Sequence, residues 1–173
     1  MDDLAEVACS AASPIGGSNI DDLLTEAEAL LDGGRLDEAE SLCRSIGLEC
    51  APAVYACGTL ALRSGDASAA ATLFRAAELL APTVAAFSVG SARALLDLKD
   101  AAAALERARV ALGLDPSLTV AHRLAAEAAA SLGHHAQAAR HLICVTEEMP
   151  DDANAWNALG LARMRVGELE TAV

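Results

Sequence analysis

Aromatic residues are scarce in this chain, which has one tryptophan, one tyrosine and two phenylalanines among 173 residues. No stretch alternates apolar and polar residues in the way that a half-buried strand does. No apolar run approaches the roughly 18 residues of a membrane-spanning helix. The first residues, Met1–Glu6, are acidic where a secretory signal would be basic. We therefore expect a cytoplasmic protein built without β-sheet, and no membrane partner.

Basic side chains are also few, because 12 Lys and Arg residues stand against 25 Asp and Glu residues, for a formal net charge of −13. Nucleic-acid binding depends on neutralisation of phosphates by Lys and Arg, and anionic membrane surfaces attract basic segments. The charge balance therefore disfavours both as partners. It favours solubility, or a protein partner with basic patches.

No constellation of catalytic or metal-binding residues is present. Cys43, Cys50 and Cys57 are spaced by seven residues, which is too wide for the short pairs of a zinc site, and the five cysteines predict free thiols in a reducing compartment. His134 and His135, with His141 nearby, fit a solvated turn better than a metal site. We expect no catalytic residue, no cofactor and no metal within these residues.

What the chain has in excess is alanine, within a hydrophobic content of 54%. Alanine is the best helix former because its side chain loses no rotamer freedom in a helix. The composition therefore predicts an all-α protein. Its core buries little apolar area per residue, so its stability should be the sum of many small interfaces.

A period of 34 residues runs through several residue types. Its members are the prolines Pro82, Pro116 and Pro150, the glycines Gly65, Gly133 and Gly167, and the alanines Ala70, Ala104, Ala138 and Ala172. Proline suits the boundary between two helices, and glycine tolerates the left-handed conformation at a helix end. A fixed period of this length indicates a helix–turn–helix unit that is repeated along a solenoid.

The segment Ala153–Ala172 carries Trp156, Leu159, Gly160, Gly167 and Ala172 at the spacing W-x-x-L-G, followed by Gly and Ala. This pattern resembles the tetratricopeptide repeat (TPR) family, here of a bacterial, alanine-rich type. The resemblance implies a right-handed TPR superhelix, an α-solenoid of antiparallel helix pairs. Tryptophan occupies its position in one repeat alone, and Lys99 stands where three other repeats have glycine, at Gly65, Gly133 and Gly167.

Stepping back by 34 residues from Ala153 sets the expected organisation of the chain. We expect a flexible N-terminal arm, a degenerate first repeat, three full repeats and a truncated fifth one, over residues 1–19, 20–50, 51–84, 85–118, 119–152 and 153–173. Val173 falls just after the second helix of the fifth repeat would begin. This position predicts a module cut from a longer chain. We also expect self-association through its uncovered helix, Asn154–Arg165.

In the family, the first helix of each repeat lines a concave groove that holds a partner. The resemblance places partner-binding residues at Tyr55, Thr59, Leu62, Arg63, Val89, Arg93, Leu96, Arg123, Leu124, Glu127, Asn157, Leu161, Met164 and Arg165. The leucines, Val89 and Met164 would form an apolar strip, and the four arginines would bind carboxylates. The residues do not match the carboxylate clamp of chaperone-binding family members.

These observations favour a protein–protein interaction module that captures a peptide or an amphipathic helix of another protein in its concave groove. Two alternatives stay open. The chain is the N-terminal substrate-recruiting part of a larger bacterial transferase, such as a flagellin glycosyltransferase, in which case the full-length protein is an enzyme. Otherwise it is a secretion chaperone.

Overall fold

The computed structural model describes residues 50–171, with side chains through Gly167, and a few isolated positions between residues 25 and 41. The continuous part contains helices and no strand: α3 (Ala51–Arg63), α4 (Ala67–Leu80), α5 (Ala85–Asp97), α6 (Ala101–Leu114), α7 (Thr119–Ser131), α8 (His135–Glu148) and α9 (Ala153–Thr171). The predicted arm over residues 1–19 lies outside the described residues, as does nearly all of the predicted repeat over residues 20–50.

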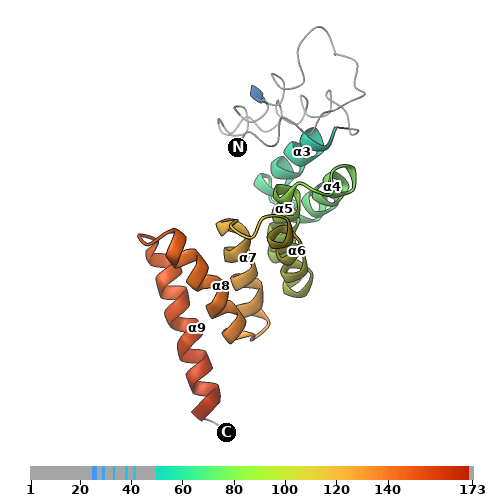
Figure 1. The fold of residues 1–173 in the computed structure, drawn as a ribbon. Coiled ribbons are helices and arrows are strands. Elements are labelled where there is room, and N and C mark those ends of the chain that lie inside the picture. The colour runs from blue at the N-terminus through green and yellow to red at the C-terminus, as the bar shows by residue number, and fades with distance from the viewer. Residues whose placement is uncertain are drawn as a thin grey trace.

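The helices stack in chain order, each packing on the one before it and the one after it (Figure 1). α3, α5, α7 and α9 begin at Ala51, Ala85, Thr119 and Ala153, 34 residues apart. Each is the first helix of a pair, and α4, α6 and α8 are the second helices. The predicted fold class, an all-α solenoid of antiparallel helix pairs, is confirmed.

The turn inside each pair is set by one residue with left-handed backbone. Gly65, Lys99 and Gly133 have φ angles of 86°, 65° and 78°. The next residue closes the turn, since the amide of Asp66 bonds to the carbonyl of Ala61 at 2.8 Å, and Asp100 and His134 make the equivalent bonds. Lys99 adopts this conformation without the freedom of glycine, at a cost of roughly 1–2 kcal/mol.

The second helix of two pairs begins at an aspartate that caps it. The carboxylate of Asp66 accepts the amide of Ala69 at 2.9 Å, and that of Asp100 accepts the amide of Ala103 at 3.0 Å. Side-chain oxygens at this position satisfy amides that the helix itself leaves unpaired. The turn residue and the cap together fix where one helix ends and its partner begins.

α9 departs from this pattern. Gly167 stands where the earlier repeats turn, yet α9 runs through it to Thr171 and has 19 residues where α3, α5 and α7 have 13. In the described residues no further helix packs on the outer side of α9, where Trp156 is exposed. The turn expected at Gly167 is therefore absent from this structure.

The core is made of alanine and glycine around a few large side chains. Phe74 of α4 is buried between Gly58 of α3 and Gly90 of α5, and a Cβ added at either glycine would lie 2.8 or 2.7 Å from the ring. Tyr55 and Phe87 pack nearby, with ring centroids 5.2 Å apart. Three of the four aromatic side chains of the protein thus gather at one end of the described stack.

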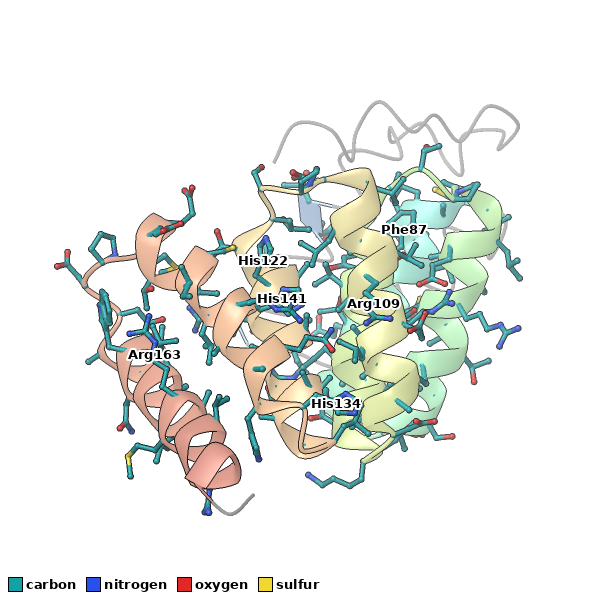
Figure 2. The ribbon with its side chains drawn as sticks, turned by 60° about the horizontal axis from the view of Figure 1, so that its bottom comes forward. Phe87, Arg109, His122, His134, His141 and Arg163 are labelled. Carbon is teal, nitrogen blue, oxygen red and sulfur yellow. The ribbon has the colours of Figure 1, made fainter. Side chains whose placement is uncertain are left out.

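A pair of histidines links the helices of the fourth repeat (Figure 2). Nε2–H of His122 donates to the carbonyl of Pro116 at 3.0 Å, so Nδ1 of His122 accepts the Nδ1–H of His141, also at 3.0 Å. Burial and the charges of His122, Arg140 and Arg109 hold the pKa of His141 below its ordinary value of 6.5. His141 thus lies against His122, because the paired helices bring positions 122 and 141 together.

One expectation about the cysteines is wrong. Cys50, which is buried at the start of α3, is disulfide-bonded, whereas Cys144 is a free thiol. The spacing of the cysteines argued against a metal site but could not show which of them approach each other in the fold.

Substitution of Gly58 by alanine should destabilise the stack by about 1–3 kcal/mol, because the new methyl group overlaps the ring of Phe74. The matched control is Gly113→Ala in α6, where no atom lies within 4 Å of the added Cβ. That control should be neutral or stabilising by up to about 1 kcal/mol. Urea unfolding measures both, and equal stabilities of Gly58→Ala and the unsubstituted protein would contradict the packing described.

The stability of the stack should fall as the pH drops below 6.5, the ordinary pKa of histidine, toward the lower folded-state pKa of His141. In this window the unfolded chain binds a proton that the folded chain resists, so acid favours unfolding. Urea unfolding at about pH 7.5 and about pH 5 measures the loss. His141→Gln should reduce it, and His134→Gln in the exposed turn should not; equal pH profiles for the two variants would rule out His141 as the source.

Candidate functional site

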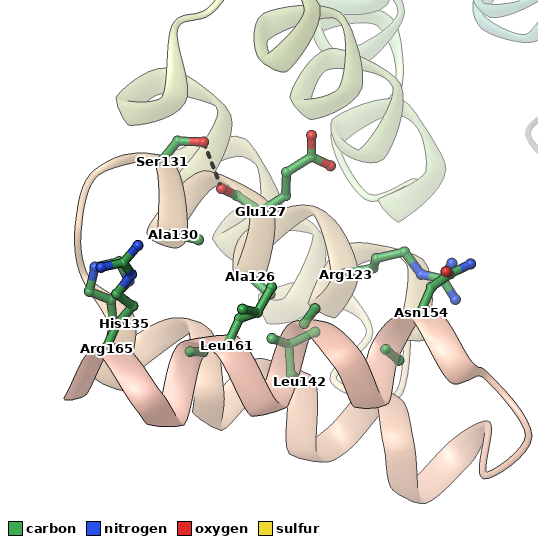
Figure 3. Close-up of a pocket in the computed structure, with 13 residues that line it drawn as sticks. Arg123, Ala126, Glu127, Ala130, Ser131, His135, Leu142, Asn154, Leu161 and Arg165 are labelled. Atoms are coloured by element: carbon green, nitrogen blue, oxygen red, sulfur yellow. Dashed lines mark hydrogen bonds between the residues drawn. The ribbon is translucent and has the colours of Figure 1, made fainter. Parts of the chain in front are cut away.

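A groove of about 540 Å³ lies between α7 and α9, which are consecutive first helices of the stack (Figure 3). α8 contributes two residues to it. The lining residues are Arg123, Ala126, Glu127, Ala130, Ser131, His135, Leu142, Asn154, Ala155, Ala158, Leu161, Ala162 and Arg165. Most of the surface inside is apolar, and the charged side chains lie along its edges.

Helical spacing explains the shape of the groove. On α7, Arg123, Ala126, Glu127 and Ala130 recur at three- and four-residue intervals and so share one face. On α9, Asn154, Ala158, Leu161 and Arg165 do the same. Alanine in the middle of both faces leaves a furrow between the two helices, and Leu161, 56% exposed, stands in it.

The two ends of the groove are polar. Figure 3 shows His135 and Arg165 at one end, and Arg123 and Asn154 at the other. Glu127 lies on the edge between them, exposed to solvent. A ligand lying along the groove would therefore meet an apolar floor flanked by hydrogen-bond donors at each end.

The arginine at one end is held by the protein itself. Arg123 pairs with Asp152 at 2.6 Å, and the Asp152 side chain is only 12% exposed. The same carboxylate caps α9, since it accepts the amides of Asn154 and Ala155 at 3.0 and 3.2 Å. Arg123 thus fixes the start of α9 against α7, and much of its charge is neutralised. Arg165, at the other end, is exposed.

The structure brings four of the residues predicted for a groove into this one: Arg123, Glu127, Leu161 and Arg165. Asn157 and Met164 lie on the same helix but outside the groove lining, with Met164 exposed. Position around the helix is the reason, because Asn157 and Met164 lie about 100° and 120° around α9 from Ala158, which lines the groove.

The remaining predicted residues lie elsewhere. Leu96 and Leu124 are covered by neighbouring helices in the core, so the predicted apolar strip is interrupted at both. Arg93 is exposed and pairs with Asp97 at 3.7 Å, and Arg63 is also exposed. The others are half-buried on α3 and α5: Tyr55, Thr59, Leu62 and Val89.

His135 and Leu142 line the groove but were absent from the predicted set. Both belong to α8, a second helix, and the resemblance carried positions over from first helices only. Predicting that these two residues line the groove would require the position of α8 relative to α9, which the repeat pattern does not specify.

The fold is shared with solved structures that have low sequence identity to this chain. MamA superposes with a TM-score of 0.75 at 17% identity, covering 86% of this chain and 85% of MamA. YrrB, described as a TPR protein with an unusual peptide-binding site, gives 0.72 at 20% identity over 87% and 79%. The first TPR of Spaghetti (RPAP3), bound to the HSP90 peptide SRMEEVD, gives 0.66 at 21% identity over 68% and 93%.

No curated protein matches this sequence. A sequence model described as tetratricopeptide repeat matches residues 55–118, which span α3 to α6. This match, the 34-residue spacing of the first helices and the shared solenoid fold agree with one another. Residues 55–118 thus match the tetratricopeptide repeat family, and the helices of the same solenoid fold continue through α9.

Proposed function

We propose that this protein is an interaction module whose groove between α7 and α9 binds a short extended segment of another protein. The observation that carries the proposal is the exposed apolar furrow between two polar ends. Peptide-binding sites of this kind combine apolar contacts for affinity with a few placed polar groups for orientation.

The groove has the length of a short peptide. From Asn154 to Arg165 α9 advances eleven residues, or about 16 Å at 1.5 Å per residue. An extended chain rises about 3.3 Å per residue. About five residues of ligand therefore span the groove from end to end.

The chemistry of the groove selects the ligand. A central aliphatic side chain would bury the exposed Leu161 and pack against the alanines of α7. A carboxylate at the end formed by His135 and Arg165 would accept charge-assisted hydrogen bonds. Glu127, on the edge between the ends, disfavours acidic residues in the middle of the segment. The preferred segment is therefore aliphatic at its centre and acidic at one end.

The structural neighbours support the same class of function. The Spaghetti (RPAP3) domain holds the peptide SRMEEVD, whose last four residues include three acidic ones, and YrrB is described by a peptide-binding site. Across residues 50–171 no cluster of three or more histidines, cysteines, aspartates or glutamates could hold a metal. No described helix is both long and apolar enough to span a membrane. The proposal assigns binding, and no chemical step, to this groove.

Arg165→Glu should weaken a labelled pentapeptide with a central leucine and two C-terminal glutamates by about tenfold or more, because a charge-assisted hydrogen bond contributes roughly 1.5–3 kcal/mol. The matched control is Arg163→Glu, which makes the same charge change at an exposed position about 200° away around α9. Fluorescence anisotropy measures both affinities.

The control should bind within about twofold of the unsubstituted protein, apart from long-range repulsion that salt removes. Equal losses of peptide affinity in the two variants would show that the effect comes from the change in net charge alone, and would contradict the assigned site. Failure of the unsubstituted protein to bind the pentapeptide would contradict the proposed ligand chemistry.

A further inference from the structure

A second groove, of about 860 Å³, lies between the second helices α4 and α6, and α5 forms its floor. α5 presents Ser91 and Leu95 to this groove. Arg93 lies about 200° around the helix from Ser91, so the groove opens on the side of the stack away from the predicted concave residues. It shares no residue with the groove between α7 and α9.

Two polar atoms in the lining of this groove have no partner. The Glu78 side chain is 13% exposed; its Oε2 accepts from Arg107 at 3.3 Å, while its Oε1 is buried and unbonded. Ser91 is 3% exposed, and its hydroxyl oxygen is also buried and unbonded. Buried polar groups are nearly always hydrogen-bonded, so a carboxylate oxygen and a hydroxyl left open beside a groove call for a donor.

The rim of the groove is apolar and unusually exposed. Leu79 of α4 is 78% exposed and Val110 of α6 is 40% exposed, and both line the groove. Large aliphatic side chains on opposite walls of a groove would be covered by a ligand with an aliphatic part. The donor that reaches Glu78 must therefore be carried on an apolar stem.

The charges of the lining favour a cation. Glu78, Asp100 and Glu106 stand against two cations, Arg75 and Arg107. The 3.3 Å contact between Arg107 and Glu78 is long for a charge-assisted bond, and Arg107 is 41% exposed, so its side chain can shift toward solvent. An acidic ligand would meet three carboxylates here.

We propose that the α4–α6 groove binds a lysine side chain of a partner protein, with its ammonium group donating to Glu78 and Ser91 and its methylene stem lying between Leu79 and Val110. Lysine combines a compact cation that has three donors with a four-carbon stem that packs on apolar surface. An aliphatic residue next to the lysine covers the remaining part of the rim. This site is independent of the proposed function, because it uses other helices.

The test compares two labelled pentapeptides, Ala-Leu-Lys-Leu-Ala and the same peptide with norleucine in place of lysine, by fluorescence anisotropy with the full chain. The lysine peptide should bind at least tenfold more tightly. Glu78→Gln should remove at least tenfold of its affinity, whereas Glu106→Gln, a matched loss of charge on the same rim, should change it less than threefold. Equal binding of the two peptides, or equal effects of the two variants, would overturn the proposal.

Leu79→Ser provides a second variant that cannot fail through unfolding, because Leu79 is exposed. It should weaken the lysine peptide severalfold, and Arg165→Glu should leave it unchanged, which separates this site from the α7–α9 groove. The protein has a single lysine, Lys99. Self-association that Lys99→Gln abolishes would assign the occupant to a second copy and overturn the proposal of a separate partner.

Discussion

Close approach of paired helices through residues with little or no side chain is the constraint on which the rest of the structure depends. Gly58 and Gly90 leave room for the ring of Phe74. Ala92, Ala104 and Ala126, whose side chains are single methyl groups, are buried elsewhere in the core and also let helices approach closely. Because these contacts are tight and local, each pair is fixed mainly by its neighbours in the stack. The grooves on the two sides are the spaces that such regular stacking leaves between every other helix.

The charge of the chain is distributed unevenly along the sequence, so the total net charge does not describe the helical stack that carries the two grooves. Residues 50–167 carry eleven acidic and ten basic side chains, a net charge of −1. Residues 1–49 carry twelve acidic and two basic ones, and residues 168–173 two acidic ones, which together account for the total of −13. The stack is thus close to neutral. Within it, the groove between α7 and α9 can present hydrogen-bond donors, and the groove between α4 and α6 can present a hydrogen-bond acceptor.

The fold could be predicted from the sequence because each 34-residue unit has the same types of residue at its helix boundaries and turns. Proline marks the boundary between pairs, and a left-handed residue followed by a capping group marks the turn inside a pair. The prediction of a turn at Gly167 was wrong, because α9 continues through this residue to Thr171. The contact of His122 with His141 and the disulfide of Cys50 were also beyond the repeat pattern.

The binding surface could be predicted only in part. Four of the positions predicted on first helices, Arg123, Glu127, Leu161 and Arg165, line the candidate groove, but Leu124, one residue beyond Arg123, is in the core. A shift of one residue rotates a side chain by about 100°, so a small change in how a helix sits decides between surface and core. Whether the surface serves a scaffold, the recruiting arm of a larger transferase or a secretion chaperone stays a prediction.

The packing of Phe74 between two glycines tests the account most directly, because it sets how closely α3, α4 and α5 approach one another. The measurement is a set of nuclear Overhauser effects from the ring protons of Phe74 in the unsubstituted protein. The structure predicts strong effects to the Hα protons of both Gly58 and Gly90, because both glycines approach the Cδ1 and Cε1 atoms of the ring. Effects to one glycine alone, or to neither, would contradict the close approach of α3, α4 and α5 on which the account depends.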